Sequence, residues 1–148
     1  MIYTEQTKNA MRVAYDAHKG GMDKSGLPYI YHPVHLAEQM DDETACCAAL
    51  LHDVIEDTEL TFDDLKAKGV SDTVIGIVQI LTHDDENEQY MDYIRRVKDS
   101  GDANAIKIKL ADLQHNSDIT RLNKVDEKAL GSMERYKAAY EMLLNSLN

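Results

Sequence analysis

Two short segments of the chain combine histidine with carboxylates, the side chains that bind divalent transition metals in proteins. Residues 52–57 read HDVIED, and residues 109–116 read KLADLQHN. On a helix that turns by about 100° per residue, the adjacent His52 and Asp53 can both reach one ion if it lies between their directions. Asp112 stands among apolar neighbours, where a carboxylate without a partner is costly, so it either pairs with a neighbour or coordinates an ion.

A third segment, residues 24–33 (KSGLPYIYHP), adds a second histidine. Because His32 precedes a proline that begins a helix, we expect an extended backbone there that fixes the direction of the ring. Together with the two segments above, it gives a mixed nitrogen and oxygen ligand set that suits Mn, Fe or Zn better than Mg or Ca. The simpler alternatives are a surface ion pair between Lys109 and Asp112 and a helix-capping role for His32.

More carboxylates follow His52. Residues 41–64 contain nine Asp and Glu residues and no Lys or Arg. If the helix continues through this region, Glu56 lies about 40° and Asp57 about 140° from His52 around the helix axis, on the polar half. Carboxylates gathered in this way are tolerable on a solvated surface or around a bound cation.

The segments AHKGGMDKSGLPYIYHPV, LLHDVIEDT and KLADLQHN, in this order and at these spacings, resemble the HD-domain hydrolases that degrade the alarmone (p)ppGpp. That family comprises the hydrolase half of RelA/SpoT proteins and their small single-domain relatives, and the resemblance covers residues 17–116. It implies hydrolysis of the 3′-diphosphate with release of pyrophosphate, dependent on one divalent ion, Mn²⁺ in the family. The metal ligands that it implies are His32, His52, Asp53 and Asp112.

The resemblance also implies roles for residues outside the metal site. Glu56 and Asp57 match the acidic pair that handles the attacking water, and a metal ion with a neighbouring carboxylate is suited to activating water. Lys24 supplies positive charge for an anionic substrate. The residues implied to contact or line the bound nucleotide are Lys24, Ser25, Tyr29, Asn116 and His18.

Two positions depart from the family pattern and leave alternatives open. Asp23 stands where these hydrolases commonly carry an Arg that holds the guanine base. After Asn116 the family usually continues with a basic residue, whereas Ser117 follows here, and Arg121 is a candidate to replace that charge. Hydrolysis of another nucleotide or of a nucleotide-cofactor phosphate is therefore one alternative, and a catalytically silent nucleotide sensor or interaction module is another. His83 is interpreted as peripheral. The remaining interpretations place His35 on the surface or behind a metal ligand, and His115 in the core or behind a metal ligand. Tyr136 and Tyr140 are interpreted as packing residues of the last helix.

Hydrophobic periodicity predicts an all-α fold, a single HD-domain helical bundle over residues 1–148. After a helix over residues 4–18 and an ordered loop over 22–31, a short helix begins at Pro33. A capping-box-like start at Thr61 and a stop at Gly69 bound another short helix. Further helices are expected over residues 42–54, 71–81, 88–99, 103–115 and 126–147.

The composition limits the partners of the chain. Its 148 residues include 16 Lys and Arg and 27 Asp and Glu, so the net charge is −11, which disfavours DNA or RNA polymers as ligands. The longest apolar run, residues 45–51, is too short to span a membrane, and the N-terminus has no signal-peptide pattern. Cys46 and Cys47 are expected to be reduced core residues. We therefore expect a cytoplasmic enzyme with a small nucleotide substrate and leave its oligomeric state open.

Overall fold

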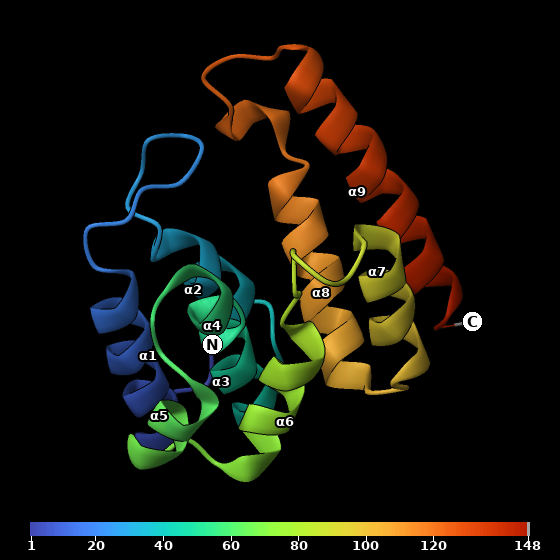
Figure 1. The fold of residues 1–148 in the computed structure, drawn as a ribbon. Coiled ribbons are helices and arrows are strands. Elements are labelled where there is room, and N and C mark those ends of the chain that lie inside the picture. The colour runs from blue at the N-terminus through green and yellow to red at the C-terminus, as the bar shows by residue number, and fades with distance from the viewer. Residues whose placement is uncertain (148) are drawn as a thin grey trace.

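The computed structural model describes residues 1–147, which form helices joined by short loops (Figure 1). The all-α prediction is confirmed, since the β pairing within these residues is an isolated bridge between Met22 and Pro28. The helices are α1 (Glu5–His18), α2 (Tyr31–Ala37), α3 (Glu43–Leu51), α4 (Val54–Asp57), α5 (Phe62–Ala67), α6 (Asp72–Leu81), α7 (Tyr90–Asp99), α8 (Ala103–Asn116) and α9 (Glu127–Asn145), with a 3₁₀ turn at Ile119–Arg121.

Side-chain caps set several helix starts where the sequence predicts them. Thr4 accepts a hydrogen bond from the backbone N–H of Thr7 at 3.2 Å and begins α1. Thr61 accepts one from the N–H of Asp64 at 3.1 Å, and Asp64 accepts one in return, so the predicted capping box of α5 is confirmed. Gly69 follows α5 with a φ of +86°, a conformation that glycine adopts without steric cost.

Helix α3 lies at the centre of the fold, in contact with α1, α2, α6 and α8. Every residue from Ala45 to Leu51 is buried, and the small Ala and Cys side chains allow neighbouring helices to approach closely. Cys46 and Cys47 are buried with free thiols, in agreement with the sequence. Because α3 is surrounded by packed helices, the residues at its C-terminal end are held in place from several sides.

Leu50 tests this central packing. Its side chain is fully buried, so Leu50→Ala is expected to lower the free energy of unfolding by about 2–5 kcal/mol through lost burial and a residual cavity. Leu130→Ala on the exposed side of α9 is the matched control, with an expected change within about 0.5 kcal/mol. Chemical denaturation of both variants measures the difference, and equal effects would contradict the central position of α3.

Helix α8 joins the two sides of the molecule. Figure 1 shows α1–α5 on one side and α7 and α9 on the other, with α8 between them, and α8 contacts α2, α3, α6, α7 and α9. This position lets residues of α8 face both the α2–α3 region and the C-terminal helices. Among residues 1–147, the helices are all too short or too polar to cross a membrane.

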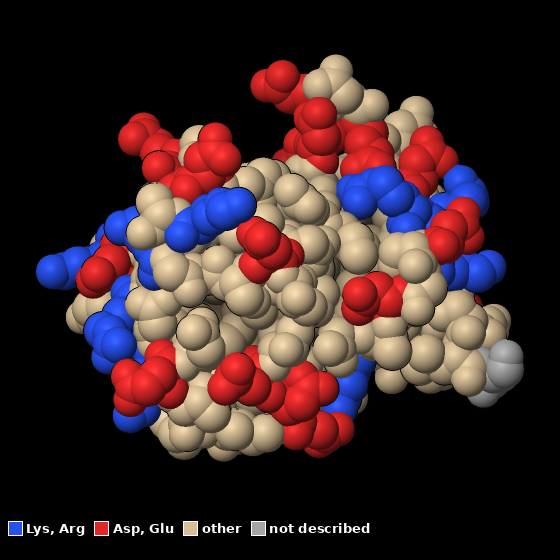
Figure 2. Space-filling model, turned by 90° about the horizontal axis from the view of Figure 1, so that it is seen from below, with Lys and Arg blue, Asp and Glu red and all other residues tan. Residues whose placement is uncertain are grey.

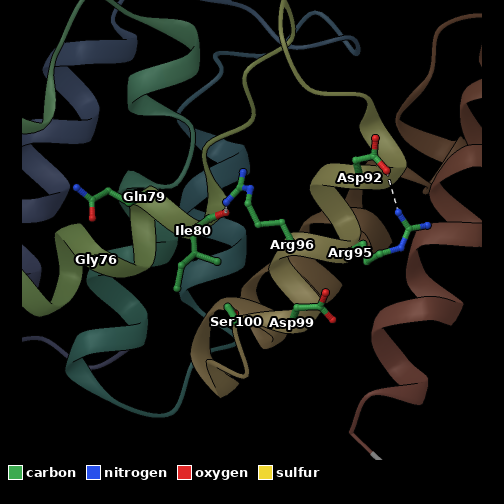
Figure 3. A pocket seen from close by; sticks show the side chains of 8 residues that line it. All are labelled: Gly76, Gln79, Ile80, Asp92, Arg95, Arg96, Asp99 and Ser100. Atoms are coloured by element: carbon green, nitrogen blue, oxygen red, sulfur yellow. Dashed lines mark hydrogen bonds and ion pairs between the residues drawn. The ribbon is translucent and has the colours of Figure 1, made fainter.

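Arg96 on α7 anchors the loop between α6 and α7. Its guanidinium donates to the carbonyl oxygens of Ile80 and Thr82, each at 2.9 Å, and to the Glu88 carboxylate at 2.8 Å. Figure 3 shows Arg96 reaching toward Ile80 along a hollow between α6 and α7, whereas Arg95 pairs with Asp92. Because Arg95 and Arg96 both pair with carboxylates, the main consequence of Arg96 is a fixed loop.

Two local predictions are wrong. The helix predicted over residues 42–54 ends at Leu51, and a turn at His52 and Asp53 separates it from α4. In an unbroken helix these neighbours would diverge by about 100°, whereas the turn brings His52 Nε2 to 2.9 Å from Asp53 Oδ2. His32 lies within the first turn of α2 rather than in extended backbone before it. Pro33 is tolerated there because N–H groups in the first turn have no helical partner.

Candidate active site

Four side chains from three separate segments converge at one point. One potential ligand atom from each of His32, His52, Asp53 and Asp112 lies within 4.8 Å of the others. His32 Nε2 is 2.9 Å from Asp112 Oδ1 and 3.7 Å from Asp53 Oδ2. Helix α2, the turn between α3 and α4, and helix α8 supply these residues, so the group exists only in the folded chain.

The orientation of His52 suits a metal ligand. Its Nδ1 is 2.7 Å from the carbonyl oxygen of Ala49, so Nδ1 is the donor to that oxygen and, in the neutral ring that binds a metal, Nε2 holds the free electron pair. Nε2 is buried and lacks a hydrogen bond of acceptable geometry within the described residues, although the Asp53 carboxylate is near. A buried unpaired nitrogen beside carboxylates fits a divalent cation, and two imidazoles with two carboxylates form a suitable donor set.

The charges around this group are strongly coupled. Burial lowers the pKa of His52, but Asp53 and Asp112 outweigh burial and hold the pKa well above its ordinary value. Burial raises the pKa of Asp112, but Lys109 and the two histidines hold it well below its ordinary value. The two carboxylates therefore create a negative potential where the ligand atoms meet, as a cation site requires.

Lys109 neutralises one side of Asp112. Its Nζ lies 2.7 Å from Asp112 Oδ2, and the side chains are only 12% and 6% exposed. The pair that the sequence allowed as a surface interaction is therefore buried. Since Lys109 occupies Oδ2, the other oxygen, Oδ1, faces His32 and also accepts a hydrogen bond from Asn116 Nδ2 at 3.1 Å.

A pocket of about 370 Å³ opens beside the four residues. Lys24, Tyr29 and Asn116 line it. His18 does not line this pocket, because it lies against the Tyr29 ring at a centroid distance of 4.7 Å and borders an adjoining hollow. Ser25 is also outside the lining and donates from its hydroxyl to the Asp23 carboxylate at 2.8 Å.

Glu56 and Asp57 face the same pocket from α4. Burial and the nearby Asp53 raise the pKa of Glu56 to about 7 and that of Asp57 to about 6. One Glu56 oxygen accepts a hydrogen bond from the backbone N–H of His83. The interpretation of His83 as peripheral is therefore wrong: the loop held by Arg96 places His83 in the pocket wall.

Asp23 organises the loop that precedes α2. Its Oδ1 accepts hydrogen bonds from the Ser25 N–H at 2.8 Å and the Leu27 N–H at 3.0 Å. Its Oδ2 lies 3.3 Å from Arg121 Nη2. Arg121 also donates to the carbonyl oxygen of His115 at 2.7 Å, so the 3₁₀ turn brings a guanidinium to the pocket, as the sequence suggested.

Helix α9 adds pocket residues that sequence reasoning missed. Tyr136, interpreted as a packing residue, lines the pocket, and its hydroxyl is 3.4 Å from Lys24 Nζ. Arg135 lies over the ring of Tyr90 at 4.9 Å from the centroid, and both also line the pocket. In the sequence, the adjacent Arg135 and Tyr136 were the available indication of a binding surface. They could be assigned to the pocket only from the packing of α9 against α7 and α8.

The fold and the site define an all-helical protein with two histidines and two aspartates gathered beside a charged pocket. A family model described as HD domain matches residues 10–131, which is most of the chain. The chain therefore belongs to the HD-domain family.

Curated relatives and a solved structure agree with this assignment. The bifunctional (p)ppGpp synthase/hydrolase SpoT of Escherichia coli K12 is 40% identical over 123 residues, covering 76% of this chain and 18% of SpoT. The guanosine-3′,5′-bis(diphosphate) 3′-pyrophosphohydrolase of Aquifex aeolicus is 32% identical over 77% of this chain and 18% of its own length. The chain thus spans less than a fifth of these relatives.

The structural similarity extends over the whole chain. A metazoan ortholog of SpoT, described as hydrolysing ppGpp, superimposes with a TM-score of 0.77 at 23% sequence identity. The match covers 100% of this chain and 88% of the other, which shows a common fold.

Proposed function

We propose that this chain is a metal-dependent phosphohydrolase that releases pyrophosphate from the 3′ position of (p)ppGpp. The observation that carries the proposal is the convergence of two histidines and two aspartates beside a pocket with acidic and cationic walls. The names of the relatives and the chemistry of the pocket supply the substrate. We further propose residues 1–148 as one HD-type domain, acting in the cytoplasm.

His32, His52, Asp53 and Asp112 are the proposed ligands of the ion, and Mn²⁺ is the proposed species. A divalent ion supplies a Lewis acid that activates water and offsets charge on phosphoryl oxygens. The chain prepares its ligands in advance: the Ala49 carbonyl orients the ring of His52, and Lys109 balances one oxygen of Asp112.

Glu56 is the proposed general base, assisted by Asp57. A carboxylate with a pKa near 7 can accept the proton of an attacking water at neutral pH and later release it toward the leaving group. The N–H of His83 holds one Glu56 oxygen, which orients the side chain toward the pocket. Asp57 lies on the same wall and carries a raised pKa for the same physical reason, burial near Asp53.

The cationic wall is the proposed phosphate-binding region, because a local positive field attracts an anion even to an acidic protein. Lys24, Arg121 and Arg135 line it. The further substrate contacts that we propose are Ser25, Tyr29, Asn116 and His18. Figure 2 shows separate acidic groups with Lys and Arg among them and no broad basic surface on the face in view, in keeping with a small nucleotide rather than a nucleic-acid polymer.

A second candidate function is hydrolysis of another nucleotide or of a nucleotide-cofactor phosphate. Asp23 favours it, because this carboxylate engages Arg121 and the loop backbone at the position where related hydrolases commonly carry an arginine for guanine. The same metal and acidic residues would serve either substrate, so the difference lies in the part of the pocket that holds the base.

A nucleotide panel distinguishes the candidates. We expect Mn²⁺-dependent release of pyrophosphate from (p)ppGpp, faster than turnover of NADPH or nucleoside triphosphates and abolished by chelator. Product chromatography with a pyrophosphate assay provides the readout. Faster turnover of another nucleotide would transfer the mechanism to that substrate, and bound metal without any turnover would favour a silent sensor.

A further inference from the structure

We propose that His115 is a positioning residue that holds the His32 ring in the form required of a metal ligand. The observation is a contact between two imidazoles: His32 Nδ1 lies 2.7 Å from His115 Nδ1. The ring planes are only 7° apart, with centroids separated by 5.0 Å. This distance equals two ring radii plus a hydrogen bond, so the rings meet edge to edge in one plane, as an N–H···N hydrogen bond requires.

The direction of this hydrogen bond decides which nitrogen of His32 is free. A neutral imidazole carries one proton, so a proton on Nδ1 leaves an electron pair on Nε2. His32 Nε2 is the atom that faces Asp112 and Asp53, at 2.9 and 3.7 Å. His115 therefore serves as the acceptor for His32 Nδ1, in the same way that the Ala49 carbonyl serves His52.

Two neighbouring residues, His35 and Arg121, fix the position of His115 beside His32. His35 stacks on its ring at a centroid distance of 4.2 Å, and Arg121 binds its carbonyl oxygen at 2.7 Å. His32 itself is 2% exposed, so water does not readily replace a lost acceptor. The inference rests on the proposed metal site, but it concerns binding of the ion rather than the identity of the substrate.

Two substitutions separate the hydrogen bond from ring packing. His115→Phe keeps a flat ring against His35 but removes the acceptor, and we expect Mn²⁺ to bind about 10–100-fold more weakly. His115→Asn loses the ring but can place its Oδ1 near the former Nδ1 position, so binding should stay within roughly threefold of the original. His35→Phe is the matched control, with unchanged binding expected because the hydrogen bond to His32 remains.

Titration of each folded full-length variant with Mn²⁺, followed by the electron paramagnetic resonance signal of the free ion, measures affinity without substrate. Thermal unfolding of the metal-free proteins shows whether each variant retains its fold. Equal affinity for the original chain and His115→Phe, or an equal loss in His115→Phe and His115→Asn, would overturn the inference and leave the proposed hydrolase intact. No Mn²⁺ binding by the original chain would overturn both.

Nuclear magnetic resonance tests the hydrogen bond directly. In protein labelled with ¹⁵N-histidine and loaded with Zn²⁺ as a diamagnetic probe, we expect scalar coupling between the two Nδ1 atoms, with the proton attached to His32. A proton attached to His115 Nδ1 would assign the donor and acceptor the other way round and overturn the inference, whatever the activity of the enzyme.

Discussion

Replacing Asp112 with Asn is expected to remove metal binding and hydrolysis together. Asp112 Oδ1 faces His32 Nε2 at 2.9 Å, and its negative charge balances the cationic groups around it. An amide has the same shape but no charge, so it is a poor ligand for a divalent ion. The loss of a residue that hydrogen-bonds a metal ligand lowers the affinity for the metal by about 10–100-fold. The loss of a ligand itself should therefore lower the affinity by more than about 100-fold.

The Asp112→Asn variant also leaves Lys109 without its buried partner. Removing one partner of such a pair destabilises a protein by about 3–5 kcal/mol, so the fold must be measured with the metal content. The double variant Asp112→Asn, Lys109→Met removes both charges and should recover stability without recovering metal. Metal content by mass spectrometry, thermal unfolding and turnover are the three readouts. A fully active, metal-replete Asp112→Asn would exclude this residue from the site.

The second large effect is expected for Glu56→Gln, which should bind the ion normally and turn over about 10²–10⁴-fold more slowly, the range for a lost general acid–base group. Glu56 is not in the group of four ligand atoms, which explains retention of the ion. The glutamine still accepts the hydrogen bond from the His83 N–H, so the loop should stay in place. Single-turnover rates and Mn²⁺ titration give the two quantities.

Asp85→Asn is the control for Glu56→Gln, because Asp85 also lines the pocket but its side chain is 88% exposed. We expect less than roughly a threefold change there, since the exposed carboxylate has no part in the proton transfer. Retained turnover in Glu56→Gln would remove Glu56 from the mechanism. An equal loss in both variants would show that the effect reflects the charge of the pocket.

The pH dependence of turnover follows from the raised pKa of Glu56. A general base must be ionised, and burial holds the pKa of this carboxyl near 7, so activity should rise as the pH increases through about 7. The rise should disappear in Glu56→Gln, whose amide does not titrate in this range. A rise that persists in the variant would assign the titration to another group.

Helices could be predicted from the sequence because their starts, stops and apolar faces are local properties. Thr4, Thr61 and Gly69 act on the backbone within a few residues, and the helix boundaries there agree closely with the prediction. The failures occur at His32 and at the turn of His52 and Asp53. The turn at His52 and Asp53 interrupts an apolar periodicity that by itself favours a continuous helix.

The candidate site likewise has a part that the sequence predicts, the types of its residues, and a part that it does not, the distances between them. Spacing and residue type identified the histidines and carboxylates on three segments, because few other side chains offer such ligand atoms. The distances among them depend on α8 packing against α2 and α3, which no local pattern specifies. The hydrogen bond from His83 to Glu56 and the approach of Tyr136 to Lys24 were missed for this reason.

The helical fold, the acidic charge and the presence of segments with histidine and carboxylates follow from the amino-acid sequence, because composition and short-range periodicity are local properties of the chain. Tertiary structure alone decided that four ligand atoms come within 4.8 Å, that Lys109 is buried against Asp112, and that His115 meets His32 in one plane. The physical reason is that burial and mutual orientation arise from packing between helices distant in the chain, which changes both the charge balance and the free electron pair of each side chain.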